Sequence, residues 1–196
     1  MLALAWRSHA RRFELAVYGV AVGSNALGGL LLHGWRSDPA RWIHDIAILS
    51  VLVFIASFGA ARYLERGTAW TMRAFALSLG ALGGLLAAAP SASYTVYAVV
   101  GVAAGLGEAL ELRRELPAIR EQGITAERWA LVGALAAFLL GATAFFVGRT
   151  EGVLCDPSSP MQWHAVWHVL SAAAMALYAY GAIAPHPAPV SSPVGR

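Results

Sequence analysis

Six apolar runs, each close to the length of a membrane-crossing helix, dominate the sequence. A helix needs about 20 residues to cross ~30 Å of hydrocarbon. The sequence therefore predicts an all-α integral membrane protein. We expect one domain over residues 1–184, a bundle of six transmembrane helices, followed by a flexible tail over residues 185–196 that is rich in Pro and Ser. The predicted spans are approximately Phe13–His33, Ile43–Tyr63, Ala69–Ala89, Ser93–Leu112, Arg128–Gly148 and Pro160–Ile183.

Composition supports this class and argues against nucleic acid as a partner. Only 13% of the residues are charged, whereas a soluble domain usually carries about 25%. The net charge of +3 comes with basic residues that lie mainly between the apolar runs, where they set membrane topology. All basic residues are Arg, and Ala and Gly are abundant. That usage is typical of GC-rich bacterial genes, so we expect a bacterial cytoplasmic (inner) membrane.

The distribution of Arg predicts the orientation. The N-terminal segment, the Arg62–Arg73 turn, a long predicted loop over Arg113–Glu127 with the adjoining Arg128, and the tail together hold 11 of the 14 Arg residues. Positively charged loops remain on the cytoplasmic side of a membrane. We therefore expect both termini in the cytoplasm.

Two histidines near the start of the last apolar run are the main candidates for chemistry. His164 and His168 are four residues apart, so they lie one above the other on one helix face. Ser159 as N-cap, Pro160 at the first helical position and Gln162 as the capping-box partner predict the start of this helix. Histidine inside a membrane segment is costly and indicates a functional site.

Two more ionisable residues are expected at the same membrane level. His33 ends the first apolar run, and Asp45 lies near the start of the second. Three neutral imidazoles and one water form a tetrahedral zinc (Zn²⁺) site with an open catalytic position, and a nearby carboxylate can act as general base. This predicts His33, His164 and His168 as metal ligands and Asp45 as the base. His44 projects roughly 100° away from Asp45, so we assign it to the interface.

Two other interpretations are compatible with the histidines. They could be interfacial residues that bond to backbone carbonyls. A haem would need axial ligands on opposite faces of its ring, which His164 and His168 on one helix face cannot both supply. His33 with one of them could, but the remaining histidine and Asp45 would then have no role.

The segment Leu154–Ala172 resembles the last-helix signature of the alkaline ceramidases, in particular through the core His-Ala-x-Trp-His-x-Leu-Ser. These belong to a superfamily of seven-helix membrane zinc hydrolases that includes the adiponectin-receptor-like proteins. The resemblance implies that His164 and His168 bind zinc. It also implies that His33 is the third ligand and Asp45 the following aspartate.

The sequence departs from that family at two points. Six spans are expected here in place of seven, with the first family helix missing. Gly29 stands where the family has a serine four residues before the first zinc histidine. The expected serine resembles a hydrogen-bonding partner for the substrate or its oxyanion.

Two hypotheses follow for function. The first is a zinc-dependent intramembrane hydrolase of a lipid amide or ester, which takes its lipid substrate from the bilayer. The second is a non-catalytic membrane subunit that keeps a structural zinc site and binds a partner membrane protein. A haem-binding membrane protein is the third and weakest hypothesis.

Overall fold

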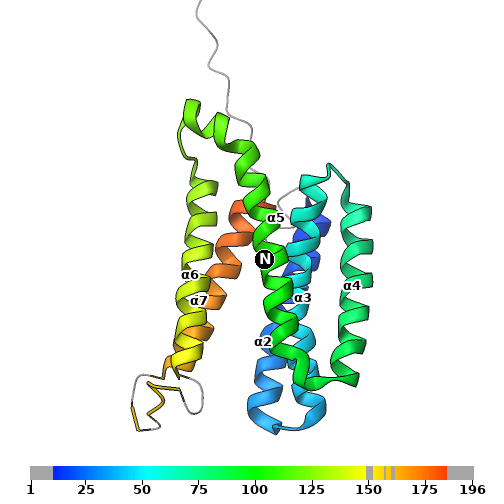
Figure 1. The fold of residues 1–196 in the computed structure, drawn as a ribbon, viewed down its shortest axis with the longest axis vertical. Helices are drawn as coiled ribbons and strands as arrows, with labels where there is room; N and C mark the ends of the chain where they lie inside the picture. The colour runs from blue at the N-terminus through cyan, green and yellow to red at the C-terminus, as the bar shows by residue number, and fades with distance from the viewer. Residues whose placement is uncertain (1–10, 149–151, 157, 160–161, 185–196) are drawn as a thin grey trace, which may run out of the picture. The chain divides into compact units, whose positions relative to one another are not determined.

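The computed structural model describes residues 11–148, 152–156, 158–159 and 162–184. Every regular element in these ranges is helical, which confirms the all-α prediction (Figure 1). Six helices are long and apolar enough to cross a membrane. The elements are α2 (Arg12–Trp35), α3 (Asp38–Tyr63), α4 (Thr68–Ala88), the short 3-10 helix η1 (Pro90–Ala92), α5 (Ser93–Gln122), α6 (Ala126–Gly148), α7 (Trp163–Tyr178) and the π-helix η2 (Ala179–Ile183), which continues α7.

The chain divides into two compact units. Unit 1 contains residues 1–15 and 126–196, and unit 2 contains residues 16–125. Each unit is described by itself below. The predicted tail over residues 185–196 lies outside the described part of the chain, and the single-domain arrangement stays a prediction.

Unit 2 is built around α3, the most buried of its helices. Helices α4 and α5 both pack against it. Its Leu49 and Val53 form the core with Leu86 of α4 and with Val96 and Val100 of α5. Burial of each such side chain contributes roughly 1.5–3 kcal/mol in water. This central position explains why α3 also carries the polar residues that need partners inside the unit.

The C-terminal parts of α3 and α5 contact each other through two glycines and, one turn further along α3, through ion pairs. Gly59 and Gly107 lie against each other, and a Cβ added at either would be 3.5 Å from the other's backbone. One turn beyond Gly59, the Arg62 guanidinium is 3.2 Å from a carboxylate oxygen of Glu108 and 3.5 Å from one of Glu111. Small residues thus bring the backbones close, and the charges pair beside them.

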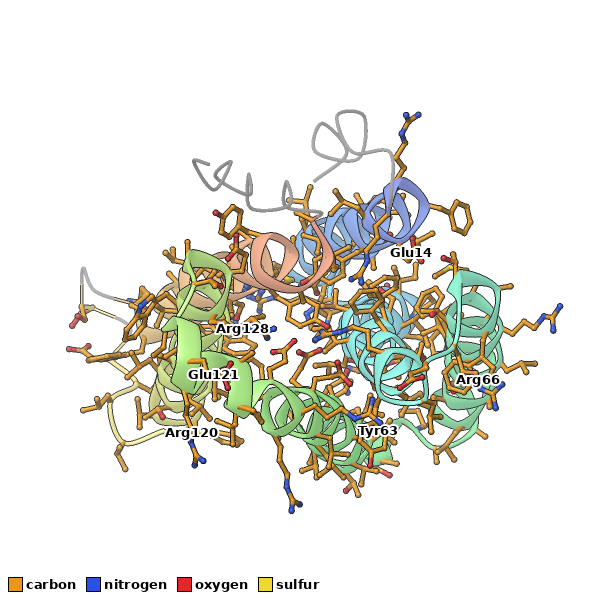
Figure 2. The ribbon with its side chains drawn as sticks, turned by 90° about the horizontal axis from the view of Figure 1, so that it is seen from above. Glu14, Tyr63, Arg66, Arg120, Glu121 and Arg128 are labelled. Atoms are coloured by element: carbon orange, nitrogen blue, oxygen red, sulfur yellow. The ribbon has the colours of Figure 1, made fainter. Side chains whose placement is uncertain are left out.

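Figure 2 looks onto this end of unit 2, where the labelled Tyr63, Arg66, Arg120 and Glu121 lie. The α3–α4 turn and the end of α5 therefore lie at the same end of the unit, as the distribution of Arg predicts. The charged residues form a polar end to three otherwise apolar helices.

The loop predicted over Arg113–Glu127 is wrong over most of its length. Helix α5 continues to Gln122, and only three residues connect it to α6. The segment holds three Arg and three Glu, which are strong helix formers, and Arg114 pairs with Glu111 one turn earlier. Gly123 then ends the helix with φ +83°, a conformation that glycine adopts most readily.

Unit 1 is an α6–α7 pair joined by the start of α2. A Cβ on Gly181 in the π-helix would lie 2.7 Å from the Glu127 carbonyl oxygen, so only glycine allows this close approach to α6. The Arg11 guanidinium donates a hydrogen bond to the Ala182 carbonyl at 3.0 Å. That bond satisfies a carbonyl group near the end of the helix.

We predict that Arg62→Ala lowers the free energy of unfolding of the purified protein by about 1–3 kcal/mol, because it removes the cation that joins α3 to Glu108 and Glu111 of α5. Arg73→Ala is the matched control, since Arg73 is an exposed Arg on α4. Thermal unfolding in detergent measures both. Equal midpoints for the two variants would show that the ion pairs add nothing to the α3–α5 contact.

Candidate metal centre

The structure places the four predicted site residues on three helices. His164 and His168 lie on α7 in unit 1, whereas His33, in the last turn of α2, and Asp45, near the start of α3, belong to unit 2. The structure brings His164 and His168 together. The meeting of all four in one zinc site stays a prediction.

Helix α7 begins at Trp163, three residues later than predicted. Gln162 occupies the N-cap position but makes no side-chain cap hydrogen bond. Its amide nitrogen instead donates to the backbone carbonyls of Ser159 and Asp156, at 2.7 and 3.3 Å. The predicted capping box is therefore wrong, because the Gln162 side chain stabilises the preceding loop. Pro160 lies outside the described residues.

The loop before α7 is closed by an aspartate-centred turn. Asp156 accepts hydrogen bonds from the hydroxyl and the backbone N–H of Ser158, at 2.7 and 2.9 Å. These donors lower the pKa of the exposed Asp156 carboxyl below its usual range. The turn leads the chain into the first turn of α7, where His164 lies.

The two histidines of α7 point at each other through the same ring atom. Their Nε2 atoms are 3.1 Å apart, and the rings are close to perpendicular at 85°. Two imidazole nitrogens bound to one tetrahedral zinc ion lie roughly 3.3 Å apart, given Zn–N bonds of about 2.0–2.1 Å. The pair therefore fits one edge of a zinc coordination sphere.

Aromatic rings from α6 and α7 support one side of this pair. The Phe145 ring centroid lies 5.9 Å from that of His164 and 5.8 Å from that of Trp167. Gly141 makes this packing feasible, because a Cβ there would be 3.1 Å from both the Trp167 ring and the Leu170 side chain. The close α6–α7 contact thus limits the orientations of the histidine rings.

Asp45 lies in a mostly buried polar group of unit 2. Its side chain is 12% exposed, and its Oδ1 is 3.5 Å from Nδ1 of His44. The Tyr97 hydroxyl of α5 is buried close to this carboxylate, and it makes no hydrogen bond within the described residues. His44, which we expected at the interface, has a side chain only 18% exposed. Its ring therefore turns toward Asp45 despite the angle between the two positions on the helix.

Tyr97 is the neighbour of Asp45 that sequence reasoning missed. A single tyrosine near the start of an apolar helix is common, because aromatic residues gather at membrane interfaces. Only the packing of α5 on α3 assigns it to the carboxylate. A useful signal would have been that its predicted span begins on the same membrane side as Asp45.

His33 lies in an exposed part of α2, one turn after Gly29. A Cβ added at Gly29 would have no atom within 4 Å. Position 29 therefore has room for a side chain, and crowding does not explain the glycine.

No match exists to any family model, curated protein or solved structure. The ceramidase resemblance thus rests on the motif of the last helix and on the spacing of His33 and Asp45.

We predict that Gly141→Leu destabilises the protein by about 1–3 kcal/mol and weakens zinc binding, because the larger side chain displaces Trp167 from α6. Gly101→Leu is the control, since a Cβ at Gly101 meets open space. Thermal unfolding and competition with a zinc chelator measure the two effects. Wild-type zinc affinity in Gly141→Leu would show that the α6–α7 contact does not support the histidines.

Proposed function

We propose that the protein is an integral membrane hydrolase that uses zinc to cleave a lipid amide or ester. The observation that carries the proposal is the 3.1 Å separation of the His164 and His168 Nε2 atoms, which matches two ligands of one zinc ion. His33 is the third ligand in this proposal. The motif of the last helix, with its resemblance to the alkaline ceramidases, supports an amide of the ceramide type as substrate.

Zinc and Asp45 would have separate roles in the proposed reaction. When bound, zinc would supply an activated water and polarise the substrate carbonyl. Asp45 would accept a proton from the attacking water and return it to the leaving nitrogen or oxygen. Burial of its side chain in unit 2 supports this role, because a general base must be protected from competing bulk water.

The apolar helices support a substrate that arrives from the bilayer. All six are long enough to cross a membrane, and α7 carries its histidines at the start of such a helix. A lipid could reach this level laterally without leaving the membrane. The proposal includes a bacterial inner membrane with both termini in the cytoplasm.

Gly29 supports the second candidate, a non-catalytic subunit with a structural zinc site. In the family that the motif resembles, a serine at this position would contact the substrate or its oxyanion. Its absence removes one hydrogen-bond donor, and the loss of one such donor costs about 10²–10³ in rate. Such a subunit would keep its zinc, copurify with a membrane partner and turn over no lipid.

We predict about one zinc ion per chain in protein purified in detergent without added metal. His164→Ala/His168→Ala should abolish it, and His33→Ala should reduce it strongly, because three protein ligands hold a catalytic zinc. His186→Ala, in the C-terminal segment, is the matched histidine control. Full zinc occupancy in the double variant would contradict the proposed site.

Hydrolase activity is tested separately, with a fluorescently labelled N-acyl sphingosine in mixed micelles as the substrate. Asp45→Asn should retain zinc and lose roughly 10²- to 10⁴-fold in kcat, the usual contribution of a general base. Zinc binding without any turnover by the wild-type protein would favour the structural subunit.

We predict that Gly29→Ser raises the turnover of the labelled amide by about tenfold or more, because it restores a hydroxyl donor. The added atoms fit, since a Cβ at Gly29 meets open space. Gly23→Ser is the control on the same helix, where a Cβ also meets open space. Identical rates for the two variants would show that the serine is not the missing element.

A further inference from the structure

His44 lies directly beside Asp45 with its ring turned toward the carboxylate. Its Nδ1 is 3.5 Å from Asp45 Oδ1, and the side chains are 18% and 12% exposed. Nδ1 itself is buried and makes no hydrogen bond within the part of the chain that the structure describes. A buried polar atom without a partner costs about 1–3 kcal/mol. Asp45 is an acceptor close enough to remove this cost.

The backbone at His44 is held in place by a neighbouring helix. A Cβ on Gly28 of α2 would lie 3.0 Å from the His44 Cα and 3.1 Å from the Ala47 Cβ. Glycine therefore lets α2 approach this turn of α3 directly. This close approach limits movement of the His44 backbone toward α2.

A second possible donor to the same carboxylate comes from α5. The Tyr97 hydroxyl is buried close to Asp45 and, like His44 Nδ1, makes no hydrogen bond within the described residues. An ionised carboxylate has about four lone-pair sites. Two donors would fix its plane and still leave a site free to accept a proton.

We infer that His44 is a positioning residue for Asp45: its Nδ1–H donates to the carboxylate and orients it as a proton acceptor. The inference rests on the proposed function, in which Asp45 is the general base. The observed 3.5 Å is longer than a formed hydrogen bond. Hydrogen bonds around a catalytic group are often long in the free enzyme and shorten when substrate binds.

The contact itself is tested without any turnover. The ¹⁵N chemical shifts of histidine side chains report which ring nitrogen carries the proton, and His44 is assigned as the signal lost in His44→Asn. We expect a protonated Nδ1 in the wild-type protein and a changed tautomer balance in Asp45→Asn. An unprotonated Nδ1, or a signal that Asp45→Asn leaves unchanged, would overturn the inference.

The kinetic arm compares two replacements of His44 with the labelled N-acyl sphingosine. Asn places an N–H donor close to the position of Nδ1, whereas Leu fills similar space without a donor. We expect His44→Leu to lower kcat roughly tenfold, as for the loss of one hydrogen bond to a charged group, with KM and zinc content unchanged. His44→Asn should stay close to the wild type.

The two replacements, His44→Leu and His44→Asn, are then each combined with Asp45→Asn. If His44 acts through Asp45, His44→Leu has no further effect on the residual rate in this background. Equal losses of kcat in His44→Leu and His44→Asn would show that His44 has only a structural role. A full tenfold loss when His44→Leu is added to Asp45→Asn would show the same. A wild-type protein with zinc but no turnover would refute the proposed hydrolase, and the ¹⁵N experiment would then decide the His44–Asp45 contact by itself.

Discussion

The proposed function depends on one contact, between the imidazoles of His164 and His168 in the first turns of α7. Their Nε2 atoms are 3.1 Å apart, a separation at which two neutral rings share one proton or bind one metal ion. The helical spacing of His164 and His168 makes this contact feasible, and the packing of α6 through Gly141 limits the alternatives. A hydrogen bond between them would need one ring to carry its proton on Nε2, whereas a zinc ion would bind both rings with Nε2 unprotonated.

The same requirement, that polar groups on apolar helices find partners, shapes unit 2. At one end of α3, Arg62 pairs with Glu108 and Glu111. Near the other end, Asp45 lies beside His44, with the buried Tyr97 hydroxyl of α5 close by. The first group is an ion pair that links two helices. The second is a mostly buried carboxylate for which we propose the role of general base.

Much of the fold follows from the sequence because its strongest signal, apolar length, needs no tertiary information. The ends of the helices are less predictable. Helix α5 runs past Leu112 because Arg and Glu, which are strong helix formers, continue it, and Arg114 pairs with Glu111. Helix α7 starts at Trp163 because the Gln162 amide binds the preceding loop. Side-chain spacing on one helix predicted the approach of His164 and His168. The position of Tyr97 beside Asp45 depends on how α5 packs on α3, which the sequence indicates only through the membrane side on which both spans begin.

The central proposal is that one zinc ion binds His33 together with the two histidines of α7. X-ray absorption at the zinc edge of the purified protein tests it most directly, because the spectrum reports the number and type of ligands. We predict three imidazole nitrogens and one oxygen at about 2.0–2.1 Å. A shell with only two imidazoles, or with a sulfur ligand, would contradict the account.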